Sequence, residues 1–222
     1  TSGSGKVELT ETNPVTGCAD YASMNITINA VPKPQITGPE SLCAGTSAQY
    51  TTPPAAGHTF RWKVTGGSIL SGQGTNSINV SWPAAVAGKV SVRDSIPATG
   101  YYGDDSLAVA VNPVPLATIG VSGDTICPGS VAGITIHASE AGIRYQLRND
   151  ATNEPVGTPV TGTGMDIVLS DNPQTPTVYI LATNEYYCSV QLGTKPVAAF
   201  YPVPAPVLSV TPNPVCEGEP IT

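Results

Sequence analysis

The sequence predicts an all-β protein made of repeated small β-sandwich domains, and a recurring phrase is the first reason. The phrase is Val31-Pro-Lys-Pro34, which returns as Val114-Pro-Leu-Ala117 and Val203-Pro-Ala-Pro206. A lone cysteine follows each phrase at nearly the same distance, namely Cys43, Cys127 and Cys216. Successive phrases begin roughly 80–90 residues apart (114 − 31 and 203 − 114), which is the size of one small sandwich domain. The chain is therefore predicted to be a stretch of a tandem array.

Composition is the second reason for an all-β prediction. The 222 residues include 23 Gly and 22 Pro, and only 11% are charged. No window of twelve or more residues that lacks Pro and Gly shows the apolar stripe of a helix. Short alternating runs of Val, Ile, Thr and Tyr recur instead. The pattern therefore indicates strands throughout.

Charge and hydropathy exclude several classes of partner. The formal net charge is −7, and the nine basic residues are scattered singly along the sequence, so we expect no basic face and no nucleic-acid binding. Attraction to an anionic membrane is excluded for the same reason. No apolar run approaches the length of about 18 residues that a membrane-spanning helix needs, so we expect no membrane insertion. The chain begins at Thr1 without Met or a signal peptide, and we expect it to be a piece of a larger protein.

The repeat divides the chain into four segments. Residues 1–31 are predicted to be the C-terminal strands of a partial first unit, 32–112 and 113–202 two complete domains, and 203–222 the N-terminal part of a further unit. In the first segment, strands over Lys6–Thr12 and Ser23–Asn29 flank a turn. Proline fixes φ at the joints, so we expect a semi-rigid, head-to-tail rod.

The two complete domains show the same order of strand signals. In the first we predict strands at 47–51, 59–64, 77–82, 88–93 and 106–112, and in the second at 135–138, 143–147, 165–169, 177–182 and 195–200. Alternation places Trp62 and Trp82 on inward faces. Tyr145 follows Cys127 at nearly the distance at which Trp62 follows Cys43 (145 − 127 and 62 − 43). We therefore expect Trp62, Trp82 and Tyr145 to be the core aromatics.

Three motifs of the first complete domain resemble a known family. They are Gly38-Pro-Glu-Ser-Leu-Cys-Ala-Gly-Thr-Ser-Ala-Gln-Tyr50, Phe60-Arg-Trp-Lys-Val64 and Ile69-Leu-Ser-Gly-Gln-Gly-Thr-Asn-Ser-Ile-Asn-Val-Ser-Trp82. These motifs resemble the PKD-like, immunoglobulin-like repeats of Bacteroidota surface proteins. Such repeats fill very large exported proteins of the type IX secretion pathway, including the mobile adhesins of gliding cells. The resemblance implies a PKD-like fold and a place outside a Gram-negative cell, on its surface; it covers residues 113–202 more loosely.

The cysteines fall into two classes. Cys18 and Cys188 come late in a unit, before its last strand, whereas residues 32–112 have no late cysteine to partner Cys43. In an immunoglobulin-like sandwich the early loop and the late turn lie at opposite ends, roughly 17–20 Å apart. A disulfide needs Cα atoms about 4.4–6.8 Å apart. We therefore expect Cys43 to bond to Cys188 across two stacked units, and the other cysteines to pair with units elsewhere. The alternatives are a bond from Cys127 to Cys188, and free buried thiols.

The sequence offers no recognisable catalytic or metal-binding constellation. His58 and His137 have no second histidine at ligand spacing, and Cys-x-x-Cys is absent, so we expect neither an enzyme nor a cofactor. Asp104 and Asp105 could donate oxygens to Ca²⁺, but adjacent carboxylates in a turn are more often solvated. A calcium site is therefore not supported.

Two pairs of tyrosines are candidate binding residues. Tyr101 with Tyr102, and Tyr186 with Tyr187, come at equivalent turns and could stack on sugars. Alternation would place only one tyrosine of each pair outward. We therefore favour packing of these pairs at the joints between units.

Three short motifs are candidate modification sites. Asp94-Ser-Ile96, Asp105-Ser-Leu107 and Asp124-Thr-Ile126 resemble the general O-glycosylation signal of Bacteroidota, in which the hydroxyl residue carries the glycan. The resemblance implies glycans on Ser95, Ser106 and Thr125. The alternative is that these are turn residues that lead into strands.

Together these observations predict a structural stalk segment of a large exported adhesin, which acts mechanically and has no catalytic role. Its expected partners are neighbouring repeats of the same chain, with surface glycans or outer-membrane machinery beyond them. The alternatives are a glycan- or surface-binding module, and spacer domains of a secreted polysaccharide-degrading enzyme.

Overall fold

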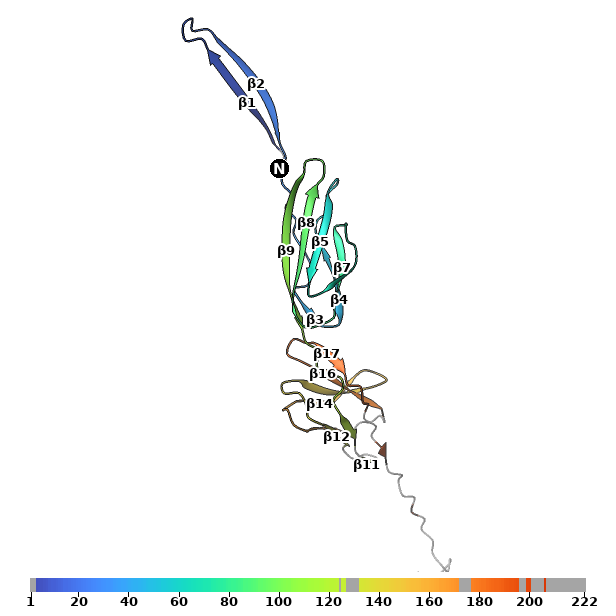
Figure 1. Ribbon diagram of the computed structural model, residues 1–222. Helices are drawn as coiled ribbons and strands as arrows, with labels where there is room; N and C mark the ends of the chain where they lie inside the picture. The colour runs from blue at the N-terminus through green and yellow to red at the C-terminus, as the bar shows by residue number, and fades with distance from the viewer. Residues whose placement is uncertain are drawn as a thin grey trace, which may run out of the picture. The chain divides into compact units, whose positions relative to one another are not determined.

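The computed structural model describes residues 3–123, 125–126, 132–171, 177–195, 199–200 and 206, and all of its regular elements in these ranges are β-strands. The chain divides into two compact units, Thr1–Val114 and Pro115–Thr222 (Figure 1). None of the described residues lies in a helix that could cross a membrane. Cys127, Cys216 and almost all of the predicted segment 203–222 lie outside the described residues.

Unit one begins with a two-stranded hairpin. β1 (Gly3–Thr12) pairs antiparallel with β2 (Ala19–Ile28), so both strands begin earlier than the sequence predicted. Asn13 shapes the turn, because its Oδ1 accepts the N–H groups of Val15 and Thr16 at 2.9 and 3.2 Å. Nearly every side chain of the hairpin is exposed.

The rest of unit one contains two sheets. The first has the order β3 (Ser41–Cys43), β9 (Tyr101–Asn112), β8 (Ala87–Ile96), β5 (Thr59–Thr65), and the second β4 (Thr46–Thr51), β7 (Ser77–Trp82), β6 (Ser68–Ser71). Side chains from both sheets form one buried cluster, namely Tyr50, Phe60, Trp62, Ile78, Val80, Trp82, Val90, Val92, Val109 and Val111. The inward faces of β5 and β7 are those that the alternation predicted. Since β3 and β6 were too short to give a pattern, the sequence did not predict them.

The Trp82 ring organises this core. Gly88 faces it so closely that a Cβ at Gly88 would lie 2.4 Å from Cζ3 of Trp82. Tyr50 meets the ring edge-on, with centroids 6.2 Å apart. The Tyr50 hydroxyl donates to the carbonyl of Pro39 at 3.1 Å, and burial raises the pKa of Tyr50. Trp62 is also buried, and its indole N–H donates to the carbonyl of Thr75 at 2.8 Å.

The first Val-Pro phrase packs along β9. Pro32 and Pro34 are buried, and a Cβ at Gly103 would meet the carbonyl oxygen of Pro32 at 1.9 Å. The backbone N–H of Ile36 donates to Asp105 Oδ2 at 2.7 Å. The phrase is therefore part of this sandwich as well as the segment that leads into it.

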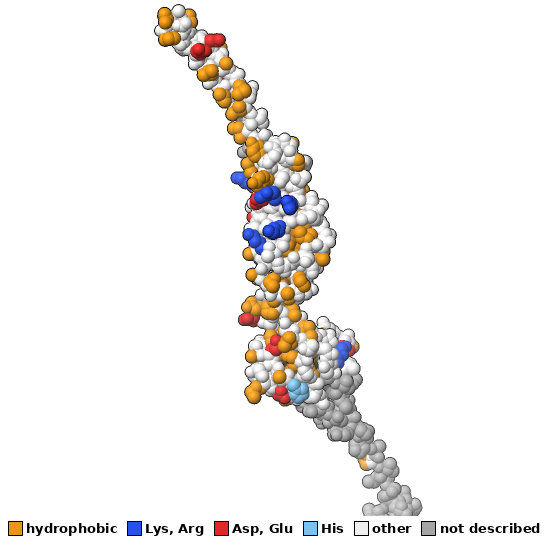
Figure 2. All heavy atoms as spheres, viewed as in Figure 1, with side chains coloured by type: hydrophobic (Ala, Val, Ile, Leu, Met, Phe, Trp, Pro, Cys, Tyr) orange, Lys and Arg blue, Asp and Glu red, His pale blue; other side chains and the backbone are white. Residues whose placement is uncertain are grey.

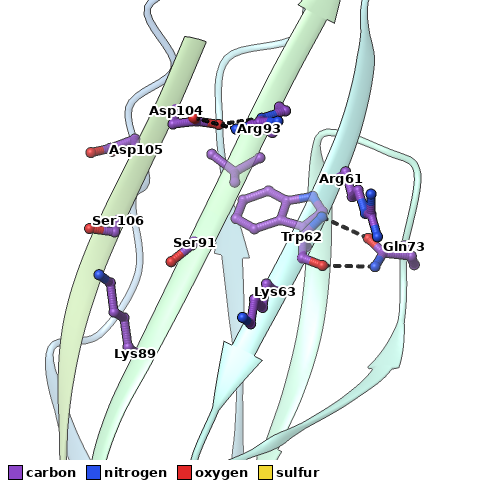
Figure 3. A pocket seen from close by; sticks show the side chains of 11 residues that line it. Arg61, Trp62, Lys63, Gln73, Lys89, Ser91, Arg93, Asp104, Asp105 and Ser106 are labelled. Atoms are coloured by element: carbon purple, nitrogen blue, oxygen red, sulfur yellow. Dashed lines mark hydrogen bonds and ion pairs between the residues drawn. The ribbon is translucent and has the colours of Figure 1, made fainter. Parts of the chain in front are cut away.

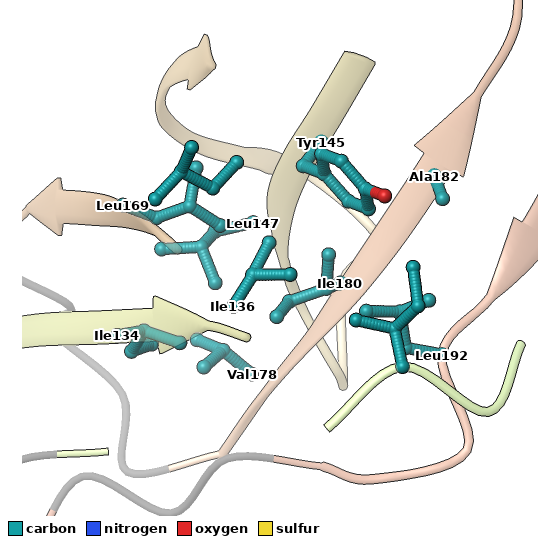
Figure 4. Close-up of a cluster of buried hydrophobic side chains, with 11 residues drawn as sticks. Ile134, Ile136, Tyr145, Leu147, Leu169, Val178, Ile180, Ala182 and Leu192 are labelled. Carbon is teal, nitrogen blue, oxygen red and sulfur yellow. The ribbon is translucent and has the colours of Figure 1, made fainter. Parts of the chain in front are cut away.

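The described residues of unit two form three sheets. Their strand orders are β10 (Val121–Gly123), β12 (Ala132–Ile136), β15 (Ile167–Asp171); β14 (Pro155–Thr161), β13 (Arg144–Asn149), β16 (Val178–Thr183), β17 (Ser189–Gln191); and β11 (Thr125–Ile126) with β18 (Ala199–Phe200). Figure 4 shows the core, in which Tyr145 lies among branched aliphatic side chains. The Tyr145 hydroxyl accepts the N–H of Glu140 at 2.9 Å, and burial raises the pKa of Tyr145. Tyr145 thus has the core position that Trp62 has in unit one.

Each unit pairs an early strand in parallel with the last of its described strands. In unit one β3 pairs parallel with β9, and in unit two β11 pairs parallel with β18. Every other strand pairing in the described residues is antiparallel.

Candidate functional site: a basic groove on unit one

The outer face of the sheet β5–β8–β9 carries a set of polar side chains. Because alternate residues of a strand point to opposite faces, the residues between the core positions all project outward. The registers place them in three rows: Arg61, Arg93 and Asp104; Lys63, Ser91 and Ser106; and Thr65, Lys89 and Ala108. Figure 3 shows the charged side chains and the two serines of these rows along the three strands.

This face holds four of the nine Lys and Arg residues of the chain, namely Arg61, Lys63, Lys89 and Arg93. The prediction that the chain has no basic face, made from the scatter of these residues in the sequence, is wrong because antiparallel pairing brings three strands together. Figure 2 shows the basic side chains gathered on unit one. We call this surface the basic groove; its volume is about 650 Å³.

The charges of the groove are not all equally available. Arg93 binds Asp104 in a bidentate ion pair, with both N···O distances 2.8 Å, and this hydrogen-bonded guanidinium lowers the pKa of Asp104. Arg93 also lies 4.0 Å from the centre of the Tyr102 ring. Asp105 accepts the N–H of Ile36. Within the described part of the chain, Arg61, Lys63 and Lys89 have no ion-pair partner.

Gln73 closes one edge of the groove. Its side-chain amide accepts the backbone N–H of Trp62 and donates to the carbonyl of Trp62, both at 2.9 Å (Figure 3). Since β5 is the last strand of its sheet, the Gln73 amide takes the place of a neighbouring strand at this residue. No local sequence motif marks this role, because Gln73 and Trp62 are 11 positions apart.

The cysteines differ in state. Cys43 and Cys188 are disulfide-bonded, whereas Cys18 is an exposed free thiol. Cys188 is buried and ends a turn in which Asn184 Oδ1 accepts its N–H at 2.9 Å. The hairpin has a similar turn, where the N–H of Asn13 donates to the carbonyl of Cys18 at 2.8 Å. The two late cysteines therefore close similar turns, while the pairing of Cys43 stays a prediction.

The tyrosine pairs are more exposed than alternation predicted. Tyr101 and Tyr102 are 47% and 52% exposed, and Tyr186 and Tyr187 are 52% and 89% exposed. The pairs are also not equivalent, because Tyr101 and Tyr102 begin β9 whereas the other pair lies in the β16–β17 turn. Tyr187 has a φ of 61° in that turn.

The weak calcium candidates do not converge. Asp104 and Asp105 are consecutive in β9 rather than in a turn, so their side chains leave opposite faces of the strand. Each carboxylate already has a partner in Arg93 or the Ile36 N–H. In the described ranges no group of three or more His, Cys, Asp or Glu residues could hold a metal ion.

The candidate glycosylation residues lie in strands. Ser95 is half-buried in β8, and Ser106 is exposed in β9, where it lines the basic groove. Thr125 belongs to β11, and its side chain is outside the described residues. Glycosylation at these positions stays a prediction.

Both histidines have carboxylate partners that the sequence analysis did not foresee. His58 Nδ1 lies 2.7 Å from Oδ1 of the buried Asp94. His137 lies between Ser122, at 3.0 Å from Nε2, and Asp166, at 2.9 Å from Nδ1. These partners lie 15 and 29 positions from His137 in sequence, so no local motif marks them.

Ser122, His137 and Asp166 are hydrogen-bonded in the same order as the residues of a hydrolytic triad, but they lie in a solvent-exposed environment. The side chains of His137 and Asp166 are 48% and 61% exposed, so water screens the pair. Triad catalysis relies on oriented donors in a water-excluded site. The N–H of Ala138 donates to Asp166 at 2.8 Å and, with His137, lowers the pKa of this carboxyl. We interpret the set as a polar tie between β10, the end of β12 and the turn before β15.

The comparisons with known proteins place one family on unit one. Residues 29–104 match the family model of a PKD-like domain. No curated protein matches the chain.

Solved structures show only distant likeness. The fibronectin(III)-like modules of Clostridium thermocellum CbhA are 13% identical, with 75% of this chain and 95% of that chain covered and a TM-score of 0.38. The Yersinia pseudotuberculosis adhesin InvE is 15% identical over 73% of this chain and 58% of that one, with a TM-score of 0.26. The Bacteroides ovatus protein SGBP-B, in complex with a mixed-linkage heptasaccharide, is 10% identical over 89% and 54%, with a TM-score of 0.25. These low scores carry no argument about function. Residues 29–104 of unit one are thus similar to a PKD-like domain, and the outer sheet face of this unit carries the basic groove.

Proposed function

We propose that the chain is a structural segment of the stalk of a large exported cell-surface repeat protein, an adhesin, and that its role is mechanical. The observation that carries the proposal is the parallel pairing of an early strand with the last described strand in each unit. When the two ends of such a unit are pulled apart, the parallel strands must slide past each other. Their hydrogen bonds are then loaded together, instead of opening one at a time.

The contact between β3 and β9 is well bonded for this purpose. The N–H of Ala110 donates to the carbonyl of Glu40, and the N–H of Ala44 donates to the carbonyl of Asn112, both at 2.8 Å. The Asn112 side chain adds a bond to Ser41 Oγ at 2.9 Å. A load on unit one would therefore meet backbone and side-chain bonds in one small region.

Force spectroscopy on the full chain in reducing buffer tests this role. Ala44→Pro removes the N–H that donates to Asn112, whereas Ala44→Ser keeps it and serves as the matched control. We expect the unfolding force of unit one to fall in the proline variant only, with a released length of roughly 280 Å for about 80 residues. Equal forces for the two variants would contradict the mechanical role.

We also propose that the units belong to a tandem, head-to-tail array. The hairpin β1–β2 has the same register as β8–β9 at a constant shift in numbering, as the pairs Gly5 with Ile26 and Gly88 with Val109 show (88 − 5 equals 109 − 26). This match supports residues 1–31 as the closing hairpin of another unit. Neighbouring repeats would then be the main partners of the chain.

A disulfide between Cys43 and Cys188 would restrict bending between the units. Both residues are disulfide-bonded, which supports the proposal without identifying their partners. Peptide mapping of the non-reduced protein should recover one peptide pair that contains both cysteines. A peptide pair that joins Cys127 to Cys188 would overturn the assignment.

An extracellular site fits a chain with disulfide bonds, since disulfides persist in oxidising compartments. In that setting Ser95, Ser106 and Thr125 would carry O-glycans. The mass of the protein from its own host, before and after chemical deglycosylation, tests this. An unchanged mass would remove the glycans from the proposal.

The second candidate function is a surface-binding module. The exposure of Tyr186 and Tyr187 favours it, because exposed aromatic rings can stack on sugars. If the chain is a binding module, the wild type should bind to a neutral-glycan array and the Tyr187→Ala variant should not. If the chain is only a stalk, neither protein should bind. A third possibility is a spacer in a secreted polysaccharide-degrading enzyme, which would bear load as a stalk does. The sequence of the parent gene would distinguish the spacer from the stalk, because only the spacer would be joined to a catalytic domain.

A further inference from the structure

We propose that the basic groove of unit one binds a linear acidic polysaccharide, whose carboxylate or sulfate groups pair with Arg61, Lys63 and Lys89. The inference does not depend on the mechanical role, since it concerns only one exposed sheet face. It also differs from sugar stacking on the loop tyrosines, because it relies on charge.

The three available cations lie one to a row. Residues two apart on a strand are separated by about 7 Å, and adjacent strands by about 4.8 Å. Arg61 and Lys63 are two apart on β5, and Lys89 on β8 lies opposite Thr65, in the next row. The cations therefore follow one another along the strand direction at the spacing of successive rows. A polymer that lies along β5 and β8 would meet them in turn.

Hydroxyl groups lie beside these cations. Ser91 and Ser106 share the middle row with Lys63, and both line the groove. The row of Arg61 also holds Arg93, which Asp104 neutralises. An acidic polysaccharide carries separated charges on rings that are rich in hydroxyl groups, so its pattern of charge and hydrogen bonding matches that of the groove.

Nucleic acid fits this surface less well. The groove lining includes one tryptophan, Trp62, and that ring is buried, so the lining gives bases no exposed platform for stacking. Three free cations on a chain of net charge −7 would neutralise few phosphates of a densely charged backbone. The acidic remainder of the chain would repel such a polymer.

Binding of the full chain, made without glycans, to polygalacturonate and dextran sulfate tests the proposal, with uncharged dextran as the control polymer. The two acidic polymers distinguish carboxylate from sulfate as the preferred group. We expect binding to at least one acidic polymer at low salt, none to dextran, and loss of binding at about 0.5 M salt because of screening.

Paired variants locate the site. Lys63→Gln with Lys89→Gln should weaken binding by up to about 25-fold, since each exposed charge contact contributes up to about fivefold. Lys6→Gln with Lys33→Gln changes the net charge equally at exposed positions outside the groove lining, and should bind as the wild type does. All four side chains are exposed, so both variants should fold.

Several outcomes would overturn the inference. These are equal binding of the groove variant and the wild type, equal losses in the two paired variants, and binding to dextran as tight as to the acidic polymers. Tighter binding to single-stranded DNA or to anionic lipid vesicles than to either acidic polysaccharide would also refute it.

Discussion

The hairpins β1–β2 and β8–β9 have nearly the same pattern of residues but opposite environments. With Gly5 aligned to Gly88, they also share lysine at Lys6 and Lys89 and the same strand pairing. Val90 is fully buried, whereas its counterpart Val7 is 50% exposed. The same contrast holds for Ile26 and Ile28 of β2 and their buried counterparts Val109 and Val111 of β9.

The difference lies in what faces each hairpin. The second hairpin packs on Trp82 and the rest of the opposing sheet, whereas no described residue buries the apolar face of the first. A lone two-stranded sheet is at best marginally stable in water. An alternating pattern therefore specifies which side of a hairpin is apolar, while burial of that side requires a second sheet.

Hydrogen exchange should show the largest difference between the hairpins. Backbone amides of β8–β9 open only with the core of unit one, whereas those of β1–β2 can open by fraying. We expect protection factors at least about 10³ higher in β8 than in β1, which corresponds to about 4 kcal/mol. Amide-resolved hydrogen exchange by NMR measures these protection factors. Equal protection of the two hairpins would contradict the expectation, because it would require contacts that stabilise the first hairpin although its side chains are exposed.

Adding one methyl group should separate the hairpins next. Gly88→Ala would place a Cβ 2.4 Å from the buried Trp82 ring, and we expect a loss of about 2–3 kcal/mol of unfolding free energy. The matched variant Gly5→Ala meets the side chain of Ile26, which is 38% exposed and can rotate away. Denaturant unfolding of the sandwich should therefore be unchanged by Gly5→Ala.

The asparagines at the C-terminal ends of the two hairpins give a smaller contrast. Asn112 donates to Ser41 Oγ and to the carbonyl of Leu42, at 2.9 and 3.3 Å, so Asn112→Ala should cost about 1 kcal/mol. Asn29, its counterpart in the same alignment (112 − 29 equals 88 − 5), is exposed. Asn29→Ala is the control, and we expect its midpoint of thermal unfolding to equal that of the wild type. A similar loss in both variants would refute this assignment.

The smallest expected effect concerns an ion pair that only the second hairpin has. Arg93 lowers the pKa of Asp104, so the pair contributes stability above the ordinary carboxyl pKa and loses it as pH falls through the lowered value. Arg93→Gln should raise the pKa of Asp104 toward that of an ordinary aspartate. Carbon-detected NMR titration of the side chain measures the midpoint, and no change in the variant would contradict the pairing.

Sequence patterns predicted the strands whose faces alternate clearly, as in β5 and β7, and they also predicted which aromatic residues are buried. They missed the first residues of β9, because Tyr101 to Asp105 contain no apolar alternation. The basic groove depends on register between strands, which places Arg61 opposite Arg93. The tie between Ser122, His137 and Asp166 likewise needs three separate segments to meet. A short-range sequence pattern contains neither the register between strands nor the approach of distant segments.

The Gln73 amide has a consequence for any chain that contains many similar sandwiches. Tethered neighbours are present at high local concentration, and unpaired edge strands are where one copy can join the sheet of another. At Trp62, both backbone groups of the edge strand β5 are already bonded to Gln73. One polar side chain in a turn thus makes part of that edge unavailable to a neighbour and favours folding of each repeat on its own.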